Sequence, residues 1–208
     1  MIKKINLKIK KNILLRLLSM FHLLSIYSFF TEVSNERYVL IKKDLNFPKV
    51  KIGSDFDIYT EDVSGLINKI EKYYKSKKNY TLTRNKINLD NEHLDLFYKQ
   101  RFLFKFDLYG LSYQSKVHND KFIKKVIETS SIHNFKFMYR YKVRLPSSNM
   151  DLMVRIFEYY QYSEKLHHKK FIENINNTAY EETSRQIETY SKVKKSKLYT
   201  NVEHRIVH

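Results

Sequence analysis

The spacing of apolar residues changes several times along the chain, and each change predicts a different element. Residues 12–34 are mostly apolar and predict one long helix, whereas residues 37–42 (RYVLIK) and 54–60 (SDFDIYT) have the composition of short strands. After Thr60, a predicted helix cap, apolar side chains recur at helical spacing. These side chains are Val63, Leu66, Ile67, Ile70 and Tyr74. The first third of the chain is therefore expected to form helix, strand, strand and helix.

The next segment, residues 81–113, has the alternation that is typical of a β-sheet. From residue 101 to residue 109 the pattern has a period of two, and a break at Lys99–Gln100 predicts a hairpin. The side chains that we expect on one face of this strand are Phe102, Phe104, Phe106 and Leu108.

From about Asn119 the spacing becomes helical. Residues 120–134 predict one helix, residues 148–151 (SNMD) have the spacing of a capping box that starts another, and further helix is expected after residue 180. We therefore predict an α+β fold. Residues 1–118 would form a small mixed β-sheet with flanking helices, and residues 119–208 a helical C-terminal region.

The N-terminal segment is both basic and apolar. Five lysines occur within the first eleven residues, and residues 13–30 then form an apolar stretch that Arg16 and His22 interrupt. This stretch is at the lower length limit for a membrane span, and its arginine is costly inside a bilayer. We expect a helix packed in the core of a cytoplasmic protein. The alternative is a helix that associates with a membrane surface.

Composition narrows the chemistry. The 208 residues include only three Gly, two Pro and no Cys, which argues against glycine-rich phosphate loops and excludes disulfides and thiolate metal sites. The formal net charge of +17 favours polyanionic partners, either nucleic acid or an anionic membrane surface. The alternative is a compositional bias towards lysine that has no functional meaning.

Two carboxylates stand out within this basic chain. Asp55 and Asp57 are separated by one residue in a predicted strand, so their side chains lie on one face. Carboxylates this close repel each other, and a divalent cation such as Mg²⁺ or Mn²⁺ relieves that repulsion. Asp107 lies in the later predicted strand. If the two strands are neighbours, three acids converge in an arrangement that suits metal-assisted phosphoryl transfer.

These segments resemble a known family. SDFDIYT, the helix after it and KFDLYG at residues 105–110 are similar to the nucleotidyltransferase superfamily, typified by DNA polymerase β. The resemblance covers roughly residues 12–115. A weaker similarity links the C-terminal part to stand-alone bacterial members that accompany polysaccharide biosynthesis. The resemblance implies transfer of a nucleoside monophosphate from an NTP to a small or glycan-precursor acceptor. Asp55, Asp57 and Asp107 would bind metal, and Asp107 would also act as base.

One feature departs from the family pattern. The family has a Gly-Ser turn after its first strand, which binds the triphosphate through backbone N–H groups. Here the corresponding residues are Ile41-Lys42-Lys43, and Gly53-Ser54 directly adjoins the aspartate pair. The remaining candidates for nucleotide binding are Ser54, Lys42, Lys43 and Arg144.

Other interpretations remain open at this point. A D-x-D pair also marks metal-dependent glycosyltransferases, and it occurs as solvent-facing acids on edge strands. A catalytically inactive protein of the same fold would instead bind RNA or a membrane through its basic face. Asp95 and Arg140 are interpreted as ordinary solvent-facing residues. The adjacent His167 and His168 are interpreted as helix-surface residues, because neighbouring helical side chains diverge by about 100° and rarely bind a metal together.

Overall fold

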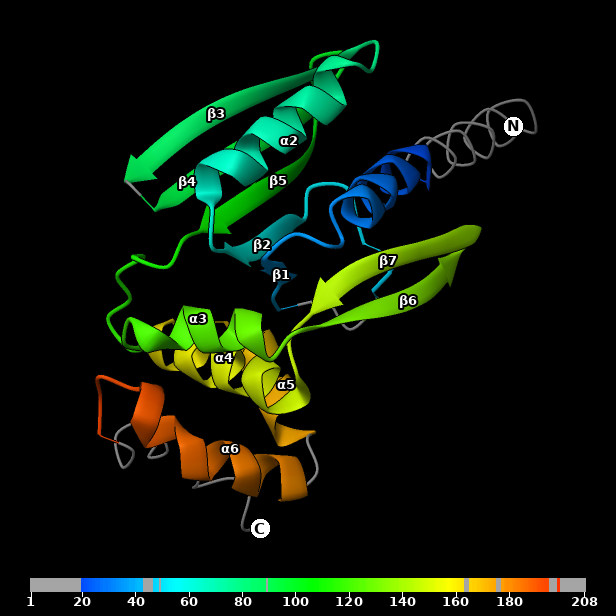
Figure 1. Cartoon of the computed structure of the whole chain (residues 1–208). Helices are drawn as coiled ribbons and strands as arrows, with labels where there is room; N and C mark the ends of the chain where they lie inside the picture. Colours follow the sequence, from blue (N-terminus) through cyan, green and yellow to red (C-terminus); the bar gives the residue numbers. More distant parts are fainter. Residues whose placement is uncertain are drawn as a thin grey trace, which may run out of the picture.

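The computed structural model describes residues 20–42, 47–48, 50–88, 90–162, 165–174, 177–194 and 198. After helical residues 20–32, the elements are β1 (Tyr38–Leu40), β2 (Asp55–Thr60), α2 (Val63–Lys75), β3 (Tyr80–Asn88), β4 (Asn91–Tyr98), β5 (Arg101–Tyr109), α3 (Lys121–Glu128), β6 (Ser131–Phe137), β7 (Tyr139–Leu145), α4 (Ser148–Gln161), α5 (Leu166–Glu173) and α6 (Asn177–Tyr190). A mixed sheet lies above the α3–α6 helices in Figure 1, with the β6–β7 hairpin to one side. The predicted α+β class is confirmed.

The main sheet has five strands in the order β1-β2-β5-β4-β3. Only β2 and β5 run parallel among its neighbouring pairs; the others are antiparallel. The parallel pairing sets Asp55 opposite Lys105 and Asp57 opposite Asp107. The sheet is therefore mixed, as predicted, and the two strands that carry the three acids are neighbours.

The predicted hairpin at Lys99–Gln100 is present, with both residues in the left-handed region (φ 48° and 65°) that a tight hairpin turn requires. The expected alternation in β5 is wrong at its start. A bulge between Leu96 and Phe97 shifts the register, so that Phe102 is 37% exposed while Leu103 is buried. A bulge inserts an unpaired residue and changes which side chains face inward.

The first hydrophobic core fills the space between one sheet face and two helices. Phe56 and Ile58 of β2 point into it, opposite in direction to Asp55 and Asp57, and α2 covers them as predicted. The described part of the N-terminal helix contributes Ile26, Tyr27, Phe29 and Phe30, all fully buried or nearly so. The interpretation as a core helix is thus confirmed for residues 20–32, and the predicted residues 12–19 lie outside the described part of the chain.

No helix among the described residues combines the length and apolarity that a bilayer crossing requires.

Two predicted helix starts differ from the structure by one or two residues. Asp62, not Thr60, caps α2, and its carboxylate accepts a hydrogen bond from the Gly65 N–H at 2.8 Å. The α4 helix has Ser147 as its N-cap residue, and no side-chain capping bond forms there, because the Ser147 hydroxyl donates to the Asn149 side chain instead.

The β6–β7 hairpin is the largest departure from prediction. The predicted helix over residues 120–134 ends at Glu128, and Ser131 begins a strand. The hairpin forms because its apolar residues alternate with polar ones, which suits a ribbon with one buried face. The side chains that pack against the first core are Phe135, Phe137, Tyr141, Val143 and Leu145.

A second core joins the helical part of the chain to the sheet. Residues of α3, α4, α5 and α6 pack with Val39 and Ile41 near β1 and with Tyr59 of β2. Beside this core the two acids of β2 differ in exposure, with the Asp55 side chain 49% exposed and the Asp57 side chain 19% exposed. The proposed division near residue 118 stays a prediction.

Candidate functional site

Three carboxylates share the open face of the main sheet. Asp55 and Asp57 face the same way because strand side chains alternate, and Asp107 lies directly opposite Asp57 on the neighbouring strand. Adjacent strands are about 4.8 Å apart, so these acids are electrostatic neighbours. The structure therefore brings together the three acids that the sequence singles out.

Lys105 accompanies these acids on the same face. Its ammonium lies 3.0 Å from Asp107 Oδ2 and 3.7 Å from Asp55 Oδ2. Burial alone would lower the pKa of Lys105, but the hydrogen bond to Asp107 and the charges of the neighbouring acids raise it. Lys105 is thus a charged counterion to the acids. Its side chain is 26% exposed, which leaves it a path to solvent.

Lys42 provides a second counterion from the other side. Its ammonium lies 3.0 Å from Asp57 Oδ1 and 3.3 Å from Glu158 Oε1, and only 8% of its side chain is exposed. Burial would lower the pKa of Lys42, yet the two acids outweigh that effect and raise it. The backbone of Lys42 has φ 53°, the left-handed region that favours glycine. The chain thus takes a glycine-like backbone conformation at Lys42. Lys43 lies outside the described residues.

Glu158 connects this charge cluster to α4. It pairs with Lys42 and also with Lys165, whose ammonium lies 2.9 Å from Glu158 Oε2. Burial would raise the pKa of Glu158, but Lys42 and Lys165 lower it overall. Acids and lysines from β2, α4 and the segment before α5 therefore form one linked network. Sequence reasoning missed Glu158, because its partner Lys42 is more than a hundred residues away.

Asp107 occupies the most buried position of the three acids and is 5% exposed. Its Oδ1 atom is buried and has no hydrogen-bond partner among the described residues, although His93 Nδ1 lies 3.6 Å away. Burial raises the pKa of Asp107, and Asp57 adds to that rise, while Lys105 and His93 oppose it. A carboxylate in this state suits a proton acceptor or a ligand to a cation.

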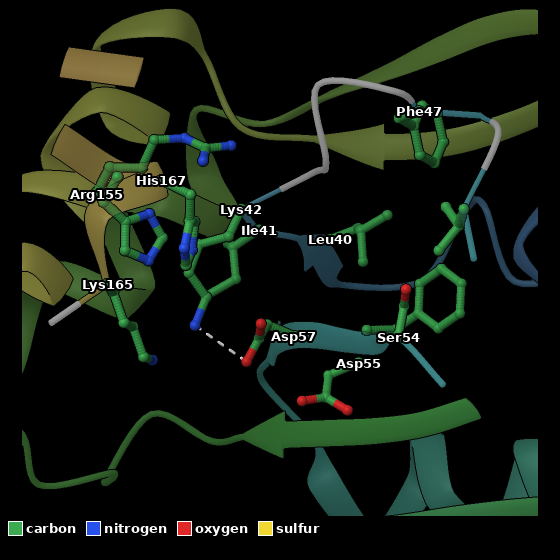
Figure 2. A pocket seen from close by; sticks show the side chains of 13 residues that line it. Leu40, Ile41, Lys42, Phe47, Ser54, Asp55, Asp57, Arg155, Lys165 and His167 are labelled. Atoms are coloured by element: carbon green, nitrogen blue, oxygen red, sulfur yellow. Dashed lines mark ion pairs between the residues drawn. The ribbon is translucent and has the colours of Figure 1, made fainter. Parts of the chain in front are cut away.

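A pocket of about 380 Å³ opens beside the aspartate pair, between β2 and the α4–α5 corner (Figure 2). Its described lining residues are Leu40, Ile41, Lys42, Phe47, Val50, Ser54, Asp55, Phe56, Asp57, Arg155, Lys165, His167 and His168. Figure 2 shows Asp55 and Asp57 on one side, with Arg155, Lys165 and His167 across from them. One wall is thus acidic and the other is rich in nitrogen donors.

The histidine pair in that second wall corrects the sequence interpretation in part. Both residues were expected on a helix surface and both line the pocket; His167 is exposed on α5 as expected, whereas His168 is only 2% exposed. Their ring centroids are 4.0 Å apart, and His168 Nδ1 is buried without a hydrogen-bond partner in the part of the chain that the structure describes. Burial, together with the neighbouring His167, lowers the pKa of His168 to about 3. His168 is therefore a neutral ring at physiological pH.

Arg155 is held in place at the same wall. Its Nε atom lies 3.2 Å from Asp151 Oδ2, and its guanidinium stacks 3.8 Å from the centre of the Phe171 ring. Arg155 was not among the predicted site residues. The only sequence signal was the i, i+4 spacing of Asp151 and Arg155 on one helix.

The other predicted residues are divided between the pocket and its surroundings. Ser54 lines the pocket, whereas Arg144 is not among the described lining residues and its guanidinium bonds to Ser130. Arg140 is exposed on β7. Asp95 lies on the open sheet face opposite Lys105, half-buried and away from the pocket.

The arrangement contains no ready-made metal cage. Among the described residues, no group of three or more His, Asp or Glu side chains is placed to hold a metal ion. Two ammonium groups, those of Lys42 and Lys105, stand at the carboxylates instead. The site combines oxygen ligands, cations and a neighbouring cavity, which together suit a phosphate-bearing ligand.

Comparison with known proteins adds no family assignment. No protein-family model matches this chain, and no curated protein sequence matches it.

Proposed function

We propose that this chain is a nucleotidyltransferase-like enzyme that uses Mg²⁺ or Mn²⁺ to transfer a nucleoside monophosphate from an NTP to a small or glycan-precursor acceptor. The observation that carries the proposal is the register of the three acids. Asp57 faces Asp107 across parallel strands, and Asp55 lies on the same face beside a pocket with a cationic far wall. The acidic wall suits a divalent ion and the opposite wall suits phosphate oxygens.

The three carboxylates are the type of ligand that a hard divalent cation prefers. Asp55, Asp57 and Asp107 offer only oxygen ligands, and Asp107 Oδ1 is a buried oxygen that finds no hydrogen-bond partner within the described segments. A bound cation would supply charge neutralisation at the phosphates. Lys105 would have to move away from Asp55 and Asp107, and its partly exposed side chain permits that movement. Lys42 is more enclosed and would remain between Asp57 and Glu158.

The remaining roles follow from position and chemistry. Asp107, with its raised pKa, would accept the proton of the acceptor hydroxyl. The acceptor oxygen would then form a bond to the α-phosphorus, and the bond to the β-phosphate would break with release of pyrophosphate. Lys42, Lys165 and Arg155 would balance the charge of the triphosphate in place of the backbone turn that the chain lacks.

The test is NTP-dependent release of pyrophosphate with Mg²⁺ or Mn²⁺ across candidate acceptors. Asp55→Asn is the informative variant, since Asp55 is 49% exposed and its loss should leave the fold intact. We expect a loss of at least about a hundredfold in rate, the scale that follows removal of one preorganised group that stabilises charge in a transition state. Asp95→Asn is the matched control, because Asp95 lies on the same sheet face but not at the pocket. Equal activity in the two variants would refute the proposal.

One observation favours a second candidate. Each of the three carboxylates already has a lysine within ion-pair distance, so much of their charge is neutralised without a metal. The second candidate is a catalytically inactive protein of the same fold that acts by binding. It predicts that neither Mn²⁺ nor an NTP–Mn²⁺ mixture shifts the unfolding temperature of the wild-type protein. A shift with Mn²⁺ and NTP together favours the enzyme.

A further inference from the structure

The outward face of the β6–β7 hairpin carries a row of cations. Lys136, Arg140 and Lys142 are exposed, and Arg144 is half-buried at the base of the hairpin. Among the ion pairs of the described residues, none includes Lys136, Arg140 or Lys142. These three positive charges therefore have no acidic partner within the described part of the molecule.

The hairpin register concentrates the charge. Lys136 lies directly opposite Arg140, and Lys142 lies opposite Asn134 on the same face. Like charges placed opposite each other destabilise a strand pair. At the tip, Met138 and Tyr139 are 56% and 66% exposed. Tyr139 pairs with Phe137 and so belongs to the opposite face of the ribbon from Lys136 and Arg140, but its ring is open to solvent where the hairpin ends. The fold keeps an unfavourable charge arrangement and an exposed aromatic side chain at one place.

The inward face fixes the hairpin to the body of the protein. Tyr27 of the N-terminal helix contacts the rings of Phe135 and Tyr141, with centroids 4.9 and 5.8 Å away. The backbone N–H of Lys142 donates to the Thr31 hydroxyl at 2.9 Å. The cations are thus displayed on a packed ribbon, which limits the entropy that a partner must remove on binding.

We propose that the outward face of the β6–β7 hairpin binds the phosphate backbone of single-stranded nucleic acid, and that the bound strand passes over the tip, where Tyr139 stacks on a base. A row of cations along a strand is complementary to a linear polyanion, and exposed aromatic rings stack on unpaired bases. A membrane-binding face needs a broad apolar surface, but Ile132 is the one apolar side chain on this face among the described residues. The inference is independent of the function proposed for the pocket.

The experiment measures binding of a fluorescent single-stranded RNA oligonucleotide by anisotropy over a range of salt concentrations. The test variant is Lys136→Gln/Arg140→Gln/Lys142→Gln. Its control is Lys72→Gln/Lys75→Gln/Lys78→Gln, which removes the same charge from exposed positions in and after α2. Each lost phosphate contact flattens the slope of log K against log salt by about 0.7, so the test variant should lose about 2. The control should keep the wild-type slope to within about 0.7, the change expected from one lost phosphate contact.

A second variant tests stacking. Tyr139→Ala should weaken binding about tenfold with an unchanged salt slope, because stacking releases no counterions. Thermal unfolding should show the triple hairpin variant to be at least as stable as wild type, since it relieves a like-charge pair. The proposal is overturned if wild type does not bind the oligonucleotide, or if the two triple variants bind equally. It is also overturned if the hairpin variant loses only binding to vesicles of anionic lipid.

Discussion

Like charges face each other across two strand pairs of this protein. Asp57 faces Asp107 across β2 and β5, and Lys136 faces Arg140 across β6 and β7. The acids have lysine partners within 3.0 Å, whereas the hairpin cations have no acidic partner among the described residues.

The difference follows from burial. Asp107 is 5% exposed, and an uncompensated charge at such a position is very costly, so the fold supplies counterions from its own side chains. Lys136 and Arg140 are exposed, where water solvates each charge and the repulsion is small. The buried site is therefore balanced internally, and its ligands must compete with resident lysines. The hairpin carries an excess of positive charge that is accessible to a binding partner.

The largest expected effect tests this compensation directly. Lys42→Met leaves Asp57 and Glu158 enclosed without their shared cation, and should lower the free energy of unfolding by about 3 kcal/mol. Lys142→Met in the hairpin should change it by less than about 0.5 kcal/mol. Urea unfolding of both variants measures the difference. The double variant Lys42→Met/Glu158→Gln should recover part of the loss, and equal effects of the two single changes would contradict this account.

Lowering the pH should protonate His168, which lines the pocket beside the acid–lysine cluster. Buried His168 has a pKa of about 3 in the folded protein, against about 6.5 when unfolded. The unfolded chain therefore binds the extra proton as pH falls below 6.5, and the stability that neutral His168 contributes is full above that pH and is lost towards pH 3. The expected slope is about 1.4 kcal/mol per pH unit, or about 2 kcal/mol between pH 7 and pH 5.

Urea unfolding at several pH values checks this slope. His168→Gln should remove most of it, while His118, whose burial lowers its pKa to about 4, should maintain a second contribution of the same sign. If wild type and His168→Gln lose stability in parallel on acidification, His168 does not carry the effect.

Local patterns in the sequence predict the cluster of acids on β2 and β5 better than they predict the other residues of the pocket. Period-two alternation predicts that Asp55 and Asp57 share a face and that Phe56 and Ile58 face the core, and the structure has both features. Lys105 was also within reach of this reasoning, because it precedes Asp107 by two residues and therefore shares its face.

The far wall of the pocket could not be predicted in this way. Arg155, Lys165 and His168 line the same pocket as Asp55 and Asp57 because α4 and α5 fold back beside β2, a contact between segments about a hundred residues apart. Hydrophobic spacing shows which face of a helix is buried but not which element buries it. The hairpin, in contrast, left a local signal in the alternation of Tyr139, Tyr141, Val143 and Leu145, and it was missed because the preceding helix was extended past Glu128.

A smaller effect is expected where resident lysine and metal compete. Lys105→Gln removes a positive charge 3.0 Å from Asp107 Oδ2, and should tighten binding of Mn²⁺ alone about tenfold, since the ion no longer displaces an ammonium group. Titration followed by electron paramagnetic resonance measures free Mn²⁺ directly. Lys105→Arg, which keeps the charge, is the control and should bind as weakly as wild type. Identical affinities in all three proteins would show that Lys105 is not a competing counterion.

The smallest expected effect lies in the hairpin. Lys136→Glu replaces a like-charge pair with an ion pair opposite Arg140, and should raise the free energy of unfolding by a few tenths of a kcal/mol. Arg140→Glu reverses the same pair and should give a similar gain, which a thermal-unfolding comparison at low salt can resolve. Both gains should disappear at high salt, because exposed pairs are screened. If either change destabilises the protein, the hairpin cations contribute to the stability of the fold. The contrast between the paired charges of the pocket and the unpaired charges of the hairpin would then be wrong.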